Sequence, residues 1–320
     1  MTVSLALAGD TMLGRGVGQR LVADPRAQLV DAGVAEAAAE ADLFVLNLEC
    51  CISERGQRFP DPQKPFFFRA PPVAAERLAE LGVDAVTLAN NHALDYGADA
   101  LLDTLELLRA VGIATVGAGA DEPSARAATV LEHRGFRLRL AGVSDHPAYY
   151  AAATDRPGIA YADLRREGVP DWLLAAARPG PDADAVLLTP HWGPNMCAEP
   201  VPHVQAAAAE LTRAGATLVA GHSAHVFQGA AGRVLFDLGD FLDDYATNDR
   251  LRNDLGLLWL VMLDREGPTR IEALPLMLEY CRTRVATGDE RRLVADLLAA
   301  RCAAVGTRVR DEGDRLVISP

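Results

Sequence analysis

The chain has 320 residues, half of them hydrophobic, so it is long enough to bury a sizeable core. Its net charge is −13 and its pI is near 5.0. This acidity argues against a nucleic-acid-binding protein, which needs a basic face for backbone phosphates.

No segment suggests a membrane or export signal. Residues 1–9 lack a basic leader, and their apolar run is shorter than a signal-peptide core. No run approaches the ~20 apolar residues that span a bilayer, so we expect a cytoplasmic protein that is not bound to a membrane. The five cysteines form no Cys-x-x-Cys pair, which argues against a disulfide scaffold or a zinc knuckle.

Strand-like apolar runs alternate with Ala- and Leu-rich helical segments along the whole chain. The predicted strands are Val3–Ala8, Leu43–Leu48, Ala85–Ala89, Ala114–Val116, Leu138–Val143, Ala185–Thr189, Thr217–Ala220 and Val234–Asp237. The predicted helices are Gly18–Ala32, Pro72–Leu81, Ala98–Val111, Asp171–Arg178, Val201–Ala214 and Asp289–Val305. This alternation predicts an α/β protein of layered sheets covered by helices. Because no composition break marks a linker, we expect residues 1–320 to form a single domain, with Leu255–Ile318 completing it.

Two irregular insertions interrupt this pattern. Arg55–Pro71 is rich in proline and aromatic residues and predicts a long ordered loop or edge hairpin. Its Phe66-Phe67-Phe68 triplet fits either a core segment or the wall of an apolar substrate site, and we favour the core. Tyr149–Glu167 is the second insertion.

Polar side chains follow the predicted strands at the points where they end. They are Asp10, Glu49, Asn90, Asn91, His92, His191, His222, His225 and Asp240. Each one alone has an ordinary explanation as a helix cap, a hydrogen-bonded loop residue or a solvated carboxylate. Open α/β sheets gather the ends of their strands at one edge, however, so together these groups predict a shared site. Carboxylate, amide and imidazole ligands suit Mn, Zn or Fe better than Mg or Ca, and a carboxylate such as Glu49 could bridge two ions.

The remaining histidines carry weaker signals. His133 lies beside Arg134 and Gly135 in an expected surface turn, and His146 precedes a proline in a loop. His203 is near the start of a helix, where we expect exposure to solvent. We keep His146 and His203 only as possible substrate contacts.

Several of these motifs occur together and in order over nearly the whole chain. They are Gly9-Asp10-Thr11-Met12-Leu13-Gly14-Arg15, Asn47-Leu48-Glu49, Leu88–Gly97 (LANNHALDYG), His191-Trp192-Gly193, Gly221-His222-x-x-His225-Val226 and Leu238-Gly239-Asp240-Phe241. Together they resemble the CapA family of poly-γ-glutamate capsule synthesis, which is similar in fold to calcineurin-like metallophosphoesterases. The resemblance implies a four-layer α/β sandwich with a metal site at the ends of its strands.

The resemblance also implies roles for particular residues. Asp10 matches the first metal ligand, Glu49 a bridging carboxylate, and Asn91, His191 and His225 further ligands, whereas His92 matches the catalytic histidine. Three positions depart from the phosphoesterase pattern: Met12 replaces a ligand histidine, Ser223 replaces the middle histidine of Gly-His-His-Pro-His, and Asn195 stands where a glutamate is common. A thioether is a poor ligand for a hard ion, so two ions, or one tight ion and a weaker second, both fit.

From these matches we predict Asp10, Glu49, Asn91, His191, His222 and His225 as metal ligands for one or two divalent ions. We predict His92, Asn90 and Arg15 as catalytic residues, with Arg15 holding a substrate carboxylate through its two-pronged guanidinium. Trp192 and Asp240 are predicted to bind substrate. Asp95, Asp240, His222 and Cys50 are candidates for a second acid or base.

Three functions fit this set of residues. Because the chain starts on its first strand without an anchor, the first is metal-dependent Cα epimerisation of a peptide, as in the lasso-type members that the family includes. The second is hydrolysis of phosphoester or poly-γ-glutamyl amide bonds, and the third is a non-catalytic protein that binds a peptide and organises partner enzymes. In each case we expect a peptide or polyanionic partner, and the sequence carries no signal for an oligomeric state.

Overall fold

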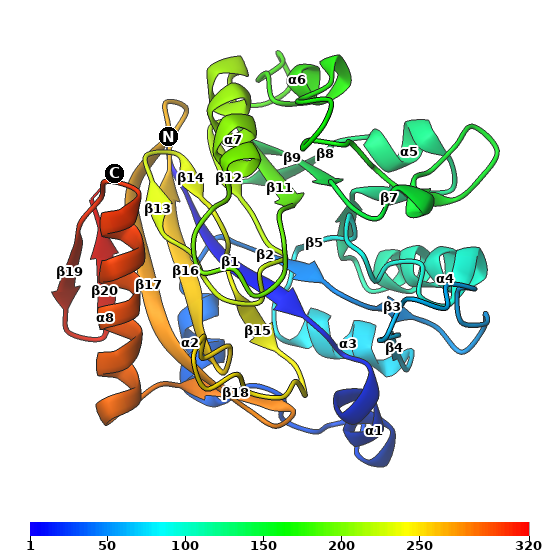
Figure 1. The fold of residues 1–320 in the computed structure, drawn as a ribbon, viewed down its shortest axis with the longest axis horizontal. Coiled ribbons are helices and arrows are strands. Elements are labelled where there is room, and N and C mark those ends of the chain that lie inside the picture. The colour runs from blue at the N-terminus through cyan, green and yellow to red at the C-terminus, as the bar shows by residue number, and fades with distance from the viewer. Residues whose placement is uncertain (320) are drawn as a thin grey trace.

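Two stacked β-sheets with helices on their outer faces form the body of the computed structural model, which describes residues 1–319 (Figure 1). The larger sheet has the order β19-β20-β17-β16-β1-β2-β5-β6, with β15 beside β1 and β18 beside β17. The smaller sheet has the order β13-β14-β12-β11-β9-β8. Two short pairs, β3 with β4 and β7 with β10, lie outside them.

The strands of the larger sheet are β1 (Val3–Thr11), β2 (Leu43–Leu48), β5 (Ala85–Thr87), β6 (Ala114–Val116), β15 (Asp240–Leu242), β16 (Leu255–Leu263), β17 (Pro268–Glu279), β18 (Arg282–Val285), β19 (Val309–Glu312) and β20 (Arg315–Ile318). Those of the smaller sheet are β8 (Thr129–His133), β9 (Phe136–Ser144), β11 (Ala185–His191), β12 (Leu218–Ala220), β13 (Ala230–Ala231) and β14 (Val234–Leu235). The short pairs comprise β3 (Cys51–Ile52), β4 (Arg69–Ala70), β7 (Ala118–Gly119) and β10 (Gly158–Ile159).

The helices are α1 (Arg15–Ala23), α2 (Ala32–Ala39), α3 (Val73–Glu80), α4 (Gly97–Ala110), α5 (Glu122–Arg126), α6 (Asp171–Ala176), α7 (Pro202–Ala214) and α8 (Gly288–Ala304), with a 3-10 turn at Ala148–Tyr150. Helix α7 begins with Pro202, whose missing N–H costs nothing in the first turn, and it ends at Gly215, whose φ is 127°. Between residues 1 and 319, no helix combines the length and apolarity that a membrane crossing requires.

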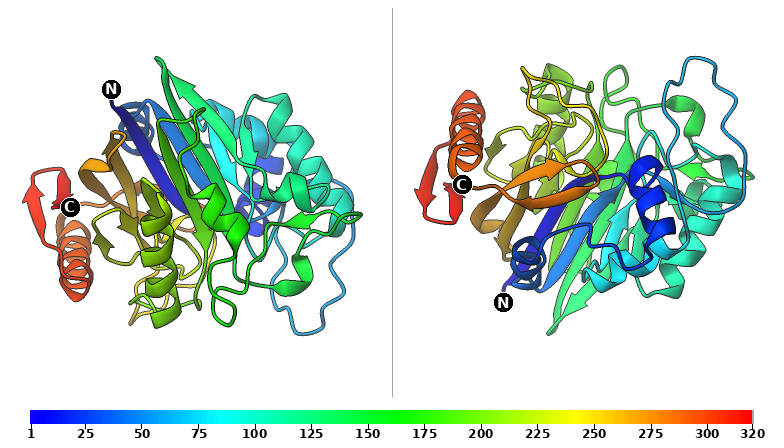
Figure 2. Two further views of the ribbon diagram at one scale, coloured as in Figure 1. Left: turned by 90° about the horizontal axis from the view of Figure 1, so that it is seen from above. Right: turned by 90° about the horizontal axis from the view of Figure 1, so that it is seen from below.

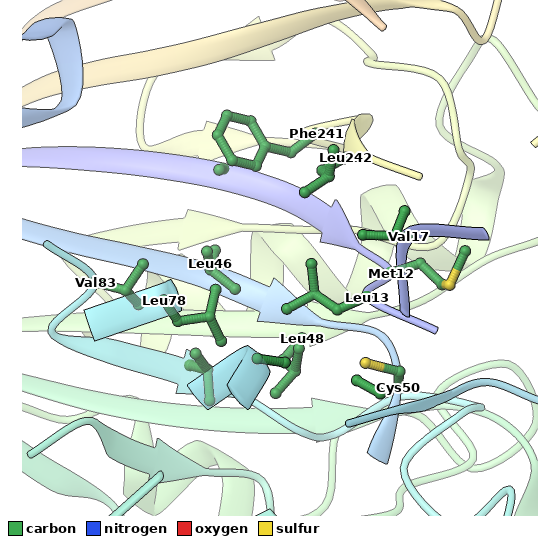
Figure 3. Close-up of a cluster of buried hydrophobic side chains, with 14 of the residues drawn as sticks. Met12, Leu13, Val17, Leu46, Leu48, Cys50, Leu78, Val83, Phe241 and Leu242 are labelled. Carbon is green, nitrogen blue, oxygen red and sulfur yellow. The ribbon is translucent and has the colours of Figure 1, made fainter. Parts of the chain in front are cut away.

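Three apolar clusters define the layers. The first lies between the sheets, where Leu5 of β1 and Leu187 of β11 share one buried cluster. The second lies between the larger sheet and α1 to α4, and Figure 3 shows part of it. The third lies between the smaller sheet and helices α6 and α7. Helix, sheet, sheet and helix therefore follow one another, and the predicted four-layer α/β sandwich is confirmed.

The remaining elements lie at the two ends of this sandwich. Helix α8 and strands β19 and β20 lie at one end, whereas the long connection between β3 and β4 projects near the other (Figure 2). That connection is the irregular loop predicted for Arg55–Pro71. Its phenylalanine triplet is not uniformly core, because Phe66 is 55% exposed and only Phe68 is fully buried.

One predicted helix is wrong. The segment Gly18–Ala32 is not continuous, because α1 ends at Ala23 and α2 begins at Ala32. Asp24 precedes a proline and takes an extended conformation (φ −140°, ψ 98°), which ends the helix. Asp31 then caps α2 by accepting a hydrogen bond from the N–H of Val34 at 2.9 Å. The helices predicted from residues 72, 98, 201 and 289 onward are confirmed to within about two residues.

Candidate metal centre

The register of the strands brings the predicted polar residues together. Asp10, near the end of β1, is the register partner of Asn47 at the end of β2 and of Asp240 at the start of β15. In the other sheet, His191 at the end of β11 forms a β-bridge with His222, which follows β12. Both sheets therefore deliver side chains to one edge of the sandwich, as parallel strands do at their carboxyl ends.

Two groups of potential metal ligands share Asp10. One comprises Asp10, His191 and His222, and the other comprises Asp10, Glu49, His225 and Asp240; within each group the ligand atoms lie within 4.8 Å of one another. His225 Nδ1 is 2.9 Å from Asp240 Oδ1 and 3.3 Å from Asp10 Oδ2. The Nδ1 atoms of His191 and His222 face each other at 2.8 Å. Asp10 therefore belongs to both ligand groups and is placed to bridge two ions, the role for which the sequence had suggested Glu49.

Unpaired polar atoms show that this cluster fits a cation. Within residues 1–319, Asp10 Oδ2, both carboxylate oxygens of Glu49, Asp240 Oδ2 and Asn91 Oδ1 are buried and lack a hydrogen-bond partner. The Nε2 atoms of His191 and His222 are also buried without a hydrogen-bond partner in this part of the chain. A buried carboxylate oxygen without a partner is costly, and a divalent ion would satisfy several of these atoms at once. Oxygen and imidazole donors together favour Mn, Zn or Fe.

Burial and mutual repulsion perturb the titration of these groups. Burial, and next the charge of Asp10, raise the pKa of Glu49 well above its usual value. Burial opposes protonation of His225, but Asp240 and Glu49 overcome it and raise the pKa of that imidazole. Burial lowers the pKa of His222 to about 3, and it lowers the pKa of His191 well below its usual value. Both imidazoles are therefore neutral, which is the form that binds metals.

A chain of side-chain amides holds this centre in place. Asn47 Nδ2 donates to Asp10 Oδ1 at 2.7 Å, and Asn90 Nδ2 donates to Asn47 Oδ1 at 2.9 Å and to the carbonyl of Leu48 at 2.8 Å. The backbone N–H of His92 donates to Asn90 Oδ1 at 3.0 Å. Both ends of the Asn90 amide are thus engaged, which corrects its predicted catalytic role to one of positioning.

His92 forms a dyad with a buried aspartate. Its Nδ1 lies 2.6 Å from Asp95 Oδ2, and its ring stacks on Phe68 with centroids 4.1 Å apart. Asp95 also accepts hydrogen bonds from the backbone N–H of Phe68 at 2.6 Å and from the Tyr150 hydroxyl at 3.1 Å. Burial lowers the pKa of His92 to about 4 despite Asp95. Asp95 therefore orients the histidine and leaves Nε2 for a substrate.

Lys64 is the only lysine in the chain, and it contacts this dyad. Its Nζ lies 3.0 Å from Asp95 Oδ1 and donates to the carbonyl of Asn91 at 2.6 Å, and its side chain is only 9% exposed. Sequence reasoning missed Lys64 because it lies in an irregular loop. The count of one lysine beside 30 arginines is the signal that could have drawn attention to it.

Aromatic rings and an arginine line the adjoining surface. Tyr245 meets the His225 ring edge-on with centroids 5.4 Å apart, and its hydroxyl is buried and unpartnered within the described chain. Burial, and next Glu49, raise the pKa of that hydroxyl. Arg15 lies 5.5 to 5.7 Å from the rings of Phe66, Phe68 and Tyr245, and pairs with Asp244 at 2.8 Å. Arg15 is therefore outside the ligand groups, with its guanidinium already paired to a carboxylate.

Three further expectations need correction. Trp192 is only 2% exposed and donates from Nε1 to the carbonyl of Phe236 at 2.9 Å, so it belongs to the core and does not bind substrate. Asp240, predicted to bind substrate, lies in the second group of potential metal ligands, which makes it a candidate ligand instead. Burial raises the pKa of the Cys50 thiol to about 12, which excludes it as an acid or base near neutral pH.

Met12 does not face the centre. It lies in the apolar cluster with Leu13 and Val17 (Figure 3), and its Sδ accepts a hydrogen bond from the N–H of Gly14 at 3.1 Å. The position at which phosphoesterases carry a ligand histidine is therefore occupied by a core residue in this chain.

A cleft of about 850 Å³ lies beside the centre. It is lined by Asp145, His146, Asp163, Arg165, Arg166, Gly193, Pro194, Asn195, Val201, Pro202 and His203. The ring of His146 is 5.0 Å from that of His191, and Asp145 Oδ2 lies 3.2 Å from His203 Nε2. His203 is therefore half-buried against the carboxylate of Asp145, whereas the sequence predicted that it would be exposed. His146 and His203 both line this cleft, as expected of substrate contacts.

The whole chain is similar to proteins of bacterial capsule synthesis. The family model described as "Bacterial capsule synthesis protein PGA_cap" matches residues 4–245. A probable polyglutamine synthesis accessory protein of Mycobacterium tuberculosis is 30% identical over 98% of this chain and 95% of its own length. The capsule biosynthesis protein CapA of Bacillus anthracis is 27% identical over 92% of this chain and 72% of its own length.

The chain also matches solved structures that are more distant in sequence. The crystal structure of a hypothetical protein from Thermus thermophilus is 18% identical, with 88% of this chain and 96% of that chain covered and a TM-score of 0.41.

Proposed function

The chain belongs to the PGA_cap family of bacterial capsule synthesis proteins, and from that premise we propose that it is a divalent-metal-dependent hydrolase of γ-glutamyl amide bonds in a polyglutamate chain. Relatives named for polyglutamine synthesis and for PGA biosynthesis support this class of substrate. The four-layer sandwich agrees with the calcineurin-like metallophosphoesterase fold of the family.

One observation carries the proposal. Two groups of buried ligands share Asp10, and within the described residues Asp10 Oδ2, both oxygens of Glu49 and Asp240 Oδ2 are unpartnered. When bound there, a divalent ion supplies Lewis acidity at the scissile carbonyl and lowers the pKa of a nucleophilic water. Asp10, Glu49, Asp240, His191, His222 and His225 would hold one or two such ions, and Asn91 is a further candidate ligand.

His92 moves the proton in this reaction. Because Asp95 accepts the hydrogen bond at Nδ1, the neutral imidazole offers Nε2 as the proton acceptor. It takes a proton from the attacking water as the new carbon–oxygen bond forms. It then delivers that proton to the departing amine nitrogen as the carbon–nitrogen bond breaks. Lys64, Phe68 and Tyr150 fix Asp95, and therefore fix the direction of the ring.

The test is incubation of the purified chain with Mn²⁺ or Zn²⁺ and a γ-linked glutamate oligomer. We expect new amino termini and shorter oligomers by mass spectrometry, and no cleavage by metal-stripped protein or by Asp10→Asn. Asp155→Asn, which changes an exposed aspartate outside the centre, is the matched control and should cleave normally. Intact oligomer with every metal tested would refute amide hydrolysis, and release of phosphate from a phosphoester in a parallel reaction would favour that substrate instead.

Cα epimerisation ranks below hydrolysis. The relatives described above carry capsule and polyglutamine-synthesis names, and these give lasso-type epimerisation no support. Running the same incubation in D₂O tests it directly, because epimerisation incorporates deuterium at an α-carbon whereas hydrolysis does not. A role as a non-catalytic binding partner predicts neither cleavage nor exchange, with binding retained.

A further inference from the structure

Two unpaired arginines lie in the cleft beside the metal centre. Arg165 and Arg166 are exposed, and within residues 1–319 neither guanidinium lies within 4.0 Å of a carboxylate. In a chain with a net charge of −13, two free cations at the lining of an 850 Å³ cleft are available to a ligand. Guanidinium groups match carboxylates in geometry and charge.

The backbone holds these arginines on a fixed turn. The preceding Leu164 is 4% exposed and packs in the outer core, and the N–H of Ala162 donates to the carbonyl of Ser144 at 3.0 Å. The N–H of Arg166 donates to Asp163 Oδ1 at 3.0 Å, which closes the turn. Both guanidinium groups therefore extend from a turn that is anchored to the end of β9.

The acidic groups of the same cleft are already engaged. Asp145 accepts a hydrogen bond from the N–H of Gly193 at 3.0 Å, lies 3.2 Å from His203 Nε2 and contacts His146 Nδ1. Asp163 is used in the turn. Helix α7 begins at the cleft without a side-chain cap, so its N-terminal dipole adds to the attraction for an anion.

The cleft is continuous with the metal centre. The N–H of Asp145 donates to the carbonyl of His191 at 3.0 Å, and the rings of His146 and His191 are 5.0 Å apart. A polymer whose amide bond is at the centre can thus extend into the cleft. Each γ-linked glutamyl unit carries a free α-carboxylate, so an adjoining unit would bring an anion to this lining.

We propose that Arg165 and Arg166 bind a carboxylate of the substrate one or more units away from the bond that is cleaved. The cleft would then be the subsite that selects an acidic oligomer over a single γ-glutamyl amide. This assignment rests on the proposed function for the identity of the polymer, but binding can be measured without any cleavage.

The test uses Arg165→Gln/Arg166→Gln, which removes both charges and keeps hydrogen-bonding side chains. Its matched control is Arg109→Gln/Arg213→Gln, which lowers the charge equally at exposed positions outside the cleft. The probes are a γ-linked glutamate pentamer and a γ-glutamyl anilide, which has one carboxylate. Steady-state kinetics are measured with metal-loaded protein, and pentamer binding to metal-stripped protein is measured by calorimetry.

For the pentamer, we expect KM to rise about tenfold in the cleft variant with kcat unchanged, since two exposed charge pairs are lost. The KM of the cleft variant for the anilide should change less than twofold. The KM of the control variant should also change less than twofold with either probe. If no variant cleaves either probe but the cleft variant binds the pentamer about tenfold more weakly, the proposed function fails and the subsite stands. Equal pentamer binding by the parent and the cleft variant would overturn the subsite, as would an equal loss of kcat on both probes.

Discussion

Glu49→Gln tests the metal centre most sharply, because both oxygens of Glu49 are buried and lack a partner within residues 1–319. Its nearest cationic group, His225 Nδ1, is 3.9 Å away. Glutamine keeps the shape but removes the charge that Asp10 repels and that a cation would attract. We therefore expect the metal-free variant to be no less stable than the metal-free parent. With metal, we expect the variant to lose much of the stabilisation that metal gives the parent.

The size of the effect follows from linkage. At a free-metal concentration 1,000-fold above Kd, binding stabilises the parent by about 4.1 kcal/mol. An unfolding entropy of about 2.1 cal/mol/K per residue gives about 0.7 kcal/mol/K for 320 residues, and hence a rise in Tm of about 6 °C. Changes to groups that only support ligands weaken metal affinity 10- to 100-fold. If Glu49→Gln weakens metal affinity about 100-fold, the same metal concentration stabilises the variant by about 1.4 kcal/mol, which corresponds to a rise in Tm of about 2 °C.

Thermal unfolding by differential scanning calorimetry, with and without Mn²⁺ or Zn²⁺, measures both states. Glu36→Gln, at an exposed position of α2, is the control and should show the full rise. An equal rise in Tm for Glu49→Gln and the parent would show that Glu49 is not a ligand. A fall in the Tm of the metal-free variant would show that the ionised carboxylate is stabilised by groups other than a cation.

Three further substitutions probe the groups around the centre. His92→Asn should lower kcat by about 10² to 10⁴ with bound metal unchanged by elemental analysis, and loss of the metal instead would make His92 a ligand. Lys64→Met removes one charged hydrogen-bond partner of Asp95, so we expect a loss of about 2 kcal/mol by chemical denaturation together with a lower kcat; stability lost without any change in kcat would deny Lys64 a role in positioning. Trp192→Phe leaves the carbonyl of Phe236 unsatisfied and should cost about 1–3 kcal/mol with KM unchanged, whereas a KM effect without destabilisation would restore Trp192 as a substrate contact.

The position of the candidate centre could be predicted because its residues obey a simple rule. Apolar runs such as Val3–Ala8 and Leu43–Leu48 are strands, and the polar residue that follows each one lies at the same sheet edge. The pattern does not tell which strand ends become neighbours. That depends on register, which places Asp240 beside Asp10 and so moves it into a ligand group.

Alternation along a strand would have placed Trp192 correctly. In β11, Leu187 faces the other sheet and Leu188 faces the outer helices. With a period of two, His191 then faces the centre and Trp192 faces the outer core, as the structure shows. The predicted substrate contact rested on proximity in sequence to His191 and did not take this period into account.

Residues in irregular segments could not be placed from the sequence. Lys64, Phe68 and Tyr150 reach Asp95 from the two insertions, whose backbone follows no periodic rule. Arg165 reaches the cleft from the second insertion in the same way. Their positions depend on tertiary contacts, such as the docking of Ala162 on Ser144, that no local pattern encodes.

The single lysine gives the dyad a unique reporter group. Apart from the amino terminus, the chain has one amine, and that amine lies against Asp95. Protein grown on isotopically labelled lysine would likewise give one ammonium resonance for Lys64, so that metal or oligomer binding at the centre could be followed by a single peak.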